Sequence, residues 1–315
     1  MLQLTVVVPA YNEAQVLEAF HARLIAVLDA LALSCSVLYV DDGSRDATWP
    51  MIEALAARDA RVGGLKLSRN FGKEAALSAG LDHVDADAAV VIDADLQDPP
   101  ELIPALVERW QAGFDVVYGT RRARAGESPL KRLTSALFYR TMERLSEIAV
   151  PRDTGDFRLL SRRALDALRQ LHERQRFMKG LFAWIGYRQT AVHYDRDPRQ
   201  AGASKWNYWR LLQLAIEGIT SFSTAPLRLA TIVGVLTSAF AFLYAAVIFT
   251  RTLLFGITVH GYPSLLVVIL FLGGIQLLAL GTIGEYLGRN YAESKQRPLY
   301  FIEERRPPRP TDRVS

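Results

Sequence analysis

The sequence has a single cysteine, Cys35, and so cannot form an internal disulfide. This excludes the class of small disulfide-rich secreted domains and favours a reducing compartment. The five histidines show no spacing that is typical of a zinc site. No Gly-x-Gly-x-x-Gly or Walker loop follows the first predicted strand, which argues against a dinucleotide or ATP site. No internal repeat and no nucleic-acid-binding motif is visible, so we expect no nucleic-acid partner.

Charged residues are absent from two long apolar runs late in the chain, Leu229–Thr250 and Pro263–Gly284. Each run has about the 20 residues that a helix needs to cross a bilayer core. Half of the sequence is hydrophobic, and its mean hydropathy is slightly positive, which is unusual for a wholly soluble enzyme. We therefore expect a C-terminal hairpin of two transmembrane helices, at about 229–250 and 263–285, joined by a short linker.

The distribution of basic residues predicts the orientation of this hairpin. Lys and Arg flank both apolar runs on their outer sides, whereas the linker at 251–262 contains only Arg251. The positive-inside rule then places both chain ends in the cytoplasm. No signal-peptide pattern precedes the first strand pattern, Leu4–Val8. We expect a multi-pass protein of the plasma membrane, the inner membrane in bacteria, with its large N-terminal domain in the cytoplasm. The modest net charge of +4 suits attraction to the membrane surface.

The chain divides into four expected parts: a cytoplasmic domain at 1–205, interfacial amphipathic helices at 206–227, the membrane hairpin at 228–288 and a cytoplasmic tail at 289–315. Trp206–Phe222 mixes aromatic and basic residues, as is typical of a helix in the headgroup layer. Leu130–Val150 is amphipathic, and we expect its apolar face to pack on the sheet. The tail from Glu303 on is rich in Pro and Arg, and we expect it to be disordered.

The first 120 residues alternate between strand patterns and helix patterns. This alternation predicts an α/β domain with a mostly parallel sheet covered by helices on both faces. The expected strands are 4–8, 36–40, 64–67, 88–92 and 115–118, and the expected helices are 13–31, 48–57, 73–84 and 100–112.

Acidic motifs follow three of these strands. They are Pro9-Ala10-Tyr11-Asn12-Glu13, Asp41-Asp42-Gly43-Ser44 and Asp93-Ala94-Asp95-Leu96-Gln97. Ligands bind at the carboxyl ends of strands in open α/β sheets, and hard divalent cations prefer oxygen ligands. Taken singly, each motif also fits ordinary turn and helix-cap chemistry. Together they outline one crevice that suits a nucleotide and a cation.

These motifs resemble glycosyltransferase family two, with its GT-A (Rossmann-like) fold. Within that family the chain is most similar to the polyprenyl-phosphate glycosyltransferases, which include the dolichol-phosphate mannose synthases and the bacterial and prophage bactoprenol glucosyltransferases. The resemblance covers nearly the whole chain, with the apolar hairpin included. The segments that carry it further are Arg69–Glu74, Gly155–Leu159, Phe177–Gly180, Glu217–Ser223, Gly261–Leu266, Leu272–Gln276 and Gly284–Arg289.

The resemblance implies roles for individual residues. The nucleotide sugar would contact Pro9, Tyr11, Glu13, Asp42, Asp93, Asp95 and Arg121. A cation, Mg²⁺ or Mn²⁺, would be held by Asp93, Asp95 and Gln97. Phosphate groups and the lipid acceptor would contact Arg121, Arg199 and Lys205. Arg199 and Lys205 also fit a basic segment drawn to anionic lipid, and both roles can hold because the implied acceptor is an anionic lipid.

Asp156 is the candidate catalytic carboxylate. It could deprotonate the acceptor, orient it, pair with Arg158, or simply cap a helix. The implied reaction transfers a hexose, with glucose from UDP-glucose favoured, to undecaprenyl or another polyprenyl phosphate in one inverting displacement. The product would serve the modification of cell-surface glycans such as lipopolysaccharide or cell wall.

Several alternatives remain at this stage. The donor could instead be GDP-mannose, a UDP-N-acetylhexosamine or an aminoarabinose nucleotide. A processive synthase is disfavoured because the only Arg-Trp pair, Arg109-Trp110, lies too early and has Leu106 where Gln is needed. A non-catalytic membrane scaffold or flippase subunit is disfavoured by the intact acidic motifs. Small residues in the second apolar run predict close helix contacts and a homo-oligomer.

Overall fold

A computed structural model describes residues 2–121, 154–171, 173–174, 176–194, 225–256 and 261–308. Within these described residues, eight strands form one sheet in the order β7-β5-β6-β4-β1-β2-β3-β8. Their bounds are β1 Gln3–Ala10, β2 Ser34–Asp41, β3 Val62–Leu67, β4 Ala88–Val91, β5 Val116–Arg121, β6 Thr154–Ser161, β7 Gln189–Tyr194 and β8 Ile302–Arg306. The central pairs β4–β1, β1–β2 and β2–β3 are parallel, whereas β6 and β8 pair antiparallel with their neighbours. The expected mostly parallel α/β sheet is confirmed.

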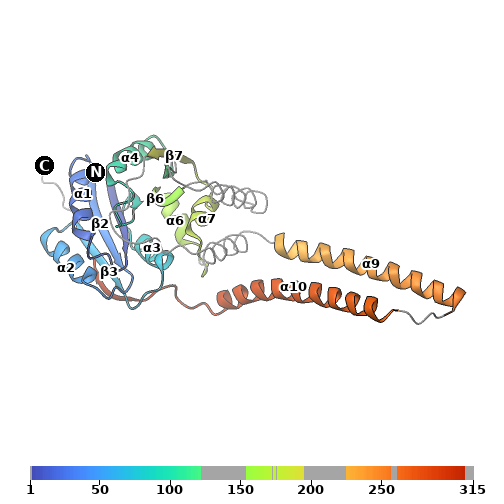
Figure 1. Cartoon of the computed structure of the whole chain (residues 1–315). Helices are drawn as coiled ribbons and strands as arrows, with labels where there is room; N and C mark the ends of the chain where they lie inside the picture. Colours follow the sequence, from blue (N-terminus) through green and yellow to red (C-terminus); the bar gives the residue numbers. More distant parts are fainter. Residues whose placement is uncertain are drawn as a thin grey trace.

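Helices cover both faces of the sheet (Figure 1). They are α1 Leu17–Asp29, α2 Thr48–Arg58, α3 Lys73–Asp82, the 3-10 turn η1 Pro100–Leu102, α4 Ile103–Gln111, α6 Arg162–Arg169 and α7 Met178–Trp184. Alternate residues of β1 divide between two cores, because successive strand side chains point to opposite faces. Val6 and Val8 pack with the helices α1, α2 and α4, while Val7 packs with α3, α6 and α7.

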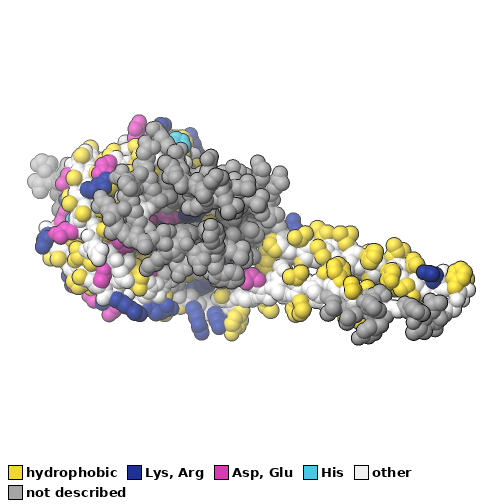
Figure 2. All heavy atoms as spheres, viewed as in Figure 1, with side chains coloured by type: hydrophobic (Ala, Val, Ile, Leu, Met, Phe, Trp, Pro, Cys, Tyr) yellow, Lys and Arg dark blue, Asp and Glu magenta, His cyan; other side chains and the backbone are white. Residues whose placement is uncertain are grey.

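Two long apolar helices, α9 Ala225–Phe255 and α10 Tyr262–Ser294, project from the sheet domain as a hairpin (Figure 1). Both are long and apolar enough to cross a membrane, and no residue of the most apolar stretch of either helix is buried. Phe240, for example, is 70% exposed. Hydrophobic side chains cover much of the rod that the two helices form (Figure 2). The helix α10 continues to Ser294, beyond the end expected near 285.

The segment after α10 returns to the sheet domain, where β8 pairs antiparallel with β3 (Figure 1). The disorder that we expected from Glu303 on is therefore wrong for residues 303–306. The edge of β3 offers unpaired backbone groups, and Lys66 of β3 lies 3.3 Å from Glu303 and 3.4 Å from Glu304. These partners lie far away in sequence, so local composition gives no sign of them. The helices expected at 130–150 and 206–222 lie outside the described residues.

Candidate active site

A hollow of about 290 Å³ lies at the carboxyl ends of the parallel strands. The loops that follow β1, β2, β3 and β4 all contribute to its wall, as expected for an open α/β sheet. The residues that line it are Pro9, Ala10, Tyr11, Glu13, Asp42, Asn70, Gly72, Lys73, Ala76, Asp93, Ala94 and Asp95. We call this hollow the acidic pocket. It brings the three predicted acidic motifs together in one place.

Hydrogen bonds fasten the loop after β1 to the loop after β2. Asn12 has a positive φ of 56°, its backbone N–H donates to Ser44 Oγ at 2.9 Å, and its Oδ1 accepts from Arg45 N at 2.8 Å. The short polar side chain of Asn tolerates this left-handed conformation, which turns the chain away from the strand. Tyr11, 41% exposed, is thereby left on the pocket wall with its ring available for stacking.

Asp42 joins the second loop to the third. Its two carboxylate oxygens accept backbone N–H groups, one from Phe71 at 2.7 Å and one from Gly72 at 2.9 Å. Burial raises the pKa of Asp42, and these two hydrogen bonds oppose the rise. Gly43 (φ 65°) also lies so close to Arg69 that an added Cβ would meet the Arg69 carbonyl carbon at 2.5 Å. Asp42 therefore shapes the pocket by fixing the loop that follows β3.

Lys73, the first residue of α3, connects two carboxylates in the floor of the pocket. Its Nζ lies 2.7 Å from Asp93 Oδ2 and 2.6 Å from Asp156 Oδ2. Burial disfavours the ammonium ion, but the two carboxylates outweigh burial and raise the pKa of Lys73. Burial likewise raises the pKa of Asp93 while Lys73 opposes the rise. The ammonium group of Lys73 thus joins Asp93 and Asp156 in one charged network.

Asp156 lies in β6 and not at a helix cap. Burial would raise its pKa, but Lys73 and Lys179 hold the pKa at about 2. Its Oδ1 is buried and has no hydrogen-bond partner within the described part of the chain. Arg158 donates to the backbone oxygen of Asp156 at 3.3 Å, not to its carboxylate, and stacks on Phe182 at 3.9 Å. Asp156 is consequently an ionised group and a weak base at neutral pH.

Glu74, beside Lys73 in α3, is a second buried carboxyl group of this network. Burial and the neighbouring Asp156 raise the pKa of Glu74 to about 7, against the effect of Lys73 and Lys179. Its Oε2 has no hydrogen-bond partner in the described segments. A proton on Glu74 would limit the repulsion between Glu74 and Asp156.

The carboxylates of Asp93 and Asp95 both line the pocket and suit a hard divalent cation. Within the described ranges, no group of three or more His, Cys, Asp or Glu could hold a metal by itself. Asp93 and Asp95 would therefore supply two of the ligands of such a cation, with its other ligands coming from elsewhere. Leu96 has a positive φ of 59°, and the Gln97 N–H donates to Asp95 Oδ1 at 3.1 Å. Gln97 itself is buried at 6% exposure and does not line the pocket.

Apart from Gln97, the predicted site residues fall into three groups. Those that the structure brings together at the pocket are Pro9, Tyr11, Glu13, Asp42, Asp93 and Asp95, with Asp156 joined through Lys73. Arg121 ends β5, where it lies opposite Tyr194 of β7, and its side chain is outside the described set. Arg199 and Lys205 also lie outside the described residues.

Sequence reasoning assigned no role to Asn70, Gly72, Lys73, Glu74 and Ala76. Four of them line the pocket, and Glu74 belongs to its charged network. The segment Arg69–Glu74 did contribute to the family resemblance and follows a strand directly. Its position at a strand end was the signal that could have identified these residues.

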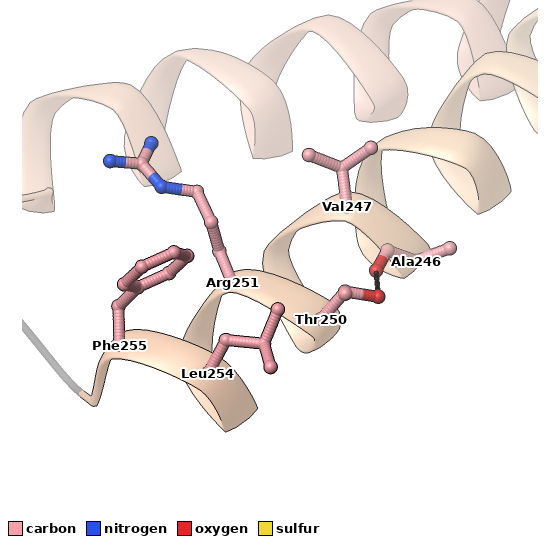
Figure 3. A pocket seen from close by; sticks show the side chains of 6 residues that line it. All are labelled: Ala246, Val247, Thr250, Arg251, Leu254 and Phe255. Carbon is pink, nitrogen blue, oxygen red and sulfur yellow. Dashed lines mark hydrogen bonds between the residues drawn. The ribbon is translucent and has the colours of Figure 1, made fainter.

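A second hollow, of about 350 Å³, lies on the apolar hairpin near the end of α9 (Figure 3). It is lined by Ala246, Val247, Thr250, Arg251, Leu254 and Phe255. Thr250 Oγ1 donates to the backbone oxygen of Ala246 at 2.8 Å, and Arg251 is the one ionisable side chain among the described residues of the lining. Among its described lining residues this shallow hollow has no carboxylate.

The sheet, with its acidic pocket at the carboxyl ends of the strands, defines a GT-A-like glycosyltransferase. Residues 5–169 match the model of glycosyl transferase family 2. The chain belongs to this family, and the resemblance drawn from its motifs is confirmed.

Relatives match along almost the entire chain. An uncharacterized glycosyltransferase of Synechocystis is 50% identical over 96% of this chain and 95% of its own length. The bactoprenol glucosyl transferase of Shigella phage SfV is 47% identical over 96% of this chain and 98% of its own. The prophage bactoprenol glucosyl transferase homolog of Escherichia coli K12 is 45% identical over 96% and 99%.

Solved structures are more distant. Mannosyl-3-phosphoglycerate synthase from Rubrobacter xylanophilus is 18% identical, with a TM-score of 0.47 over 69% of this chain and 71% of its own. Glucosyl-3-phosphoglycerate synthase from Mycobacterium tuberculosis, in complex with Mn²⁺, UDP-glucose and phosphoglyceric acid, is 21% identical, with a TM-score of 0.47 over 70% and 78%.

Proposed function

We propose that this enzyme transfers glucose from UDP-glucose to a polyprenyl phosphate, undecaprenyl phosphate in bacteria, at the cytoplasmic face of the membrane. The observation that carries the proposal is the extent of the likeness to relatives named bactoprenol glucosyl transferase. It runs over 96% of the chain and so includes both the acidic pocket and the apolar hairpin. A water-soluble donor would use the pocket, and a lipid acceptor requires the membrane that the hairpin would enter.

In this proposal the donor lies in the acidic pocket. Tyr11 stacks on the base, Pro9 and Glu13 complete the wall around the nucleoside, and Asp42 holds the loop that closes it. Asp93 and Asp95 would hold Mg²⁺ or Mn²⁺ against the donor diphosphate, with Gln97 supporting Asp95 through its backbone N–H. A bound cation would neutralise the charge that develops on the leaving diphosphate.

The reaction is a single displacement. A phosphate oxygen of the lipid attacks the anomeric carbon, the bond from this carbon to the diphosphate breaks, and the nucleoside diphosphate leaves with the electron pair. Configuration inverts, so an α-linked donor gives a β-linked product. A phosphate is ionised near neutral pH and needs no strong base. The low pKa of Asp156 agrees with this, so we assign it to positioning the network through Lys73.

Three further parts of the proposal concern phosphate binding, the membrane and the oligomeric state. Arg121, Arg199 and Lys205 would bind the phosphate groups of the donor and the lipid. Both hairpin helices would span the plasma membrane with the chain ends in the cytoplasm. We also propose a homo-oligomer, since a Cβ built on Gly273, Gly274, Gly281 or Gly284 would meet no atom of the described structure within 4 Å.

The test is to incubate the purified full chain with Mg²⁺, undecaprenyl phosphate and a panel of radiolabelled nucleotide sugars. Chromatography of the lipid fraction then shows which sugar has been transferred. We expect label from UDP-glucose, and a parallel series with Mn²⁺ ranks the two cations. Label only from GDP-mannose, a UDP-N-acetylhexosamine or an aminoarabinose nucleotide would correct the donor. Absence of labelled lipid with every donor would refute the proposal and favour a non-catalytic scaffold.

A further inference from the structure

The segment Tyr300–Arg306 follows the second apolar helix and lies against the catalytic domain. It comprises β8 and the two residues before it, and residues 295–299 connect it to the end of α10. We call it the return segment. The end of α10 also contacts the domain, because Glu293 Oε1 accepts the backbone N–H of Arg174 at 2.6 Å. The chain is thus held to the catalytic domain immediately after it leaves the hairpin.

The return segment contacts the elements on both sides of one pocket loop. This loop, residues 68–72, connects β3 to α3. On the strand side, β8 pairs with β3, and the Ser68 N–H donates to the backbone oxygen of Phe301 at 2.9 Å. On the helix side, the Tyr300 hydroxyl donates to Asp82 Oδ2 at 2.9 Å, at the end of α3. The anchoring points of the loop are therefore set by residues that lie far beyond it in sequence.

The side chain of Phe301 reaches the loop itself. Its ring lies 6.3 Å from the ring of Phe71 at an angle of 54°, and the Arg69 guanidinium covers Phe71 at 4.0 Å. The backbone N–H of Phe71 donates to Asp42, as described above. Phe71 is consequently held from two sides, by the carboxylate of Asp42 on the pocket side and by Phe301 on the outer side. The loop residues Asn70 and Gly72 line the pocket directly.

Phe301 contributes little to the stability of the core, because it is 56% exposed. A large aromatic side chain left mostly in water, but seated on a pocket loop, is better explained by what it holds in place. We propose that Phe301 is a positioning residue for donor binding. Through it, the return segment supports the loop that lines the acidic pocket and so sets the affinity of the pocket for its nucleotide. The inference rests on the proposed function only for the identity of the donor.

The experiment compares the full chain with Phe301→Ala, Phe301→Tyr and Arg305→Ala. Arg305 is an exposed residue of the same strand and serves as the matched control. We expect Phe301→Ala to raise KM for UDP-glucose about three- to tenfold, with KM for undecaprenyl phosphate and kcat unchanged within about twofold. Phe301→Tyr should restore the wild-type value, since it keeps the ring. Arg305→Ala should behave as wild type.

Hydrogen exchange at residues 68–73 provides a readout that needs no activity. We expect faster exchange there in Phe301→Ala than in wild type, and slower exchange in wild type after addition of UDP with Mg²⁺. Unchanged exchange together with unchanged KM for the donor would overturn the inference. An equal rise in KM for UDP-glucose and for undecaprenyl phosphate would also overturn the inference, because it would indicate general damage to the enzyme. If wild type transfers no sugar, the proposed function fails, and the exchange measurements still decide the role of Phe301.

Discussion

The acidic pocket and the apolar hairpin differ in the side chains that they present: ionised groups in contact in the pocket, and exposed apolar groups on the hairpin. In the pocket, ionised side chains are packed against one another, with Lys73 within 2.7 Å of both Asp93 and Asp156. In the hairpin, the described helices present large apolar side chains outward, such as Leu236 at 65% exposure and Phe240 at 70%. Exposed apolar area on this scale is unfavourable in water and favourable in lipid. The comparison shows one chain built for two solvents, with its chemistry confined to the aqueous part.

The strongest test of this division removes a charge from the pocket. Asp95→Asn keeps the shape of the side chain but loses its negative charge, so we expect transfer to fall roughly hundred- to thousandfold. Membrane association should remain. Incorporation of labelled glucose into lipid measures the effect. Asp85→Asn is the matched control, because Asp85 is 96% exposed and pairs with Arg162 away from the pocket. Normal product from Asp95→Asn would contradict the role of this carboxylate.

The reverse change adds charge to the hairpin. Leu236→Lys combined with Phe240→Lys places two cations near the middle of α9, each costing about 2.5–3.5 kcal/mol in a bilayer. We expect the variant to lose its resistance to extraction from membranes by alkaline carbonate. Phe255→Lys, at the end of the helix, should stay resistant because its side chain can reach the headgroups. Retention of the double variant in the membrane would contradict this expectation and indicate that α10 alone is a sufficient anchor.

Within the pocket, replacing Lys73, whose ammonium group lies between two carboxylates, has the next largest expected effect. Lys73→Met leaves Asp93 and Asp156 without the ammonium group that separates them. We expect kcat/KM to fall roughly ten- to hundredfold, since the carboxylate next to the donor loses its fixed position. Steady-state kinetics with both substrates measure this. Lys295→Met, an exposed lysine beyond α10, should leave the kinetics unchanged. A Lys73→Met enzyme with normal kinetics would remove Lys73 from the site.

The smallest expected effect concerns pH. The pKa of Glu74 is raised to about 7 in the folded protein, from 4.5 in an unfolded chain. Between these values the folded state holds a proton that the unfolded state has lost, so its stabilising contribution declines as pH rises from about 4.5 to 7. Glu74→Gln cannot lose this proton. The melting temperature of Glu74→Gln relative to wild type should therefore increase over that interval, by a few degrees. A difference in melting temperature between Glu74→Gln and wild type that stays constant from about pH 4.5 to 7 would show that the pKa of Glu74 is not raised.

The sequence allowed prediction of much that depends on local pattern in the first 120 residues, whereas β6, α6, α7 and β7 were not predicted. The strands β1 to β4 and the helices between them appear at the expected positions because each has its own periodicity and end signals. The acidic motifs could be placed together because parallel strands end at one edge of a sheet. The two apolar helices followed from length and the lack of charge alone.

Features that depend on distant partners could not be predicted. Lys73 lies 20 residues from Asp93 and 83 from Asp156, so no local spacing reveals that it connects them. The strand β8 is Ile-Glu-Glu-Arg-Arg, which shows no alternation of apolar and polar residues. Its pairing depends on the charges of β3 and of α2, where Glu53 contacts Arg306. Asp156 was recognised by family resemblance, but its low pKa arises from two lysines contributed by α3 and α7.

The position of β8 after both apolar helices has a consequence for biosynthesis. A ribosome makes β3 early, but the strand that covers its edge is made only after both apolar helices. Until then the nascent domain exposes an open edge, which is prone to pairing with other chains. Completion of the sheet therefore follows the synthesis of both apolar helices. Assembly of the catalytic domain is in this way completed only after both hairpin helices have been synthesised.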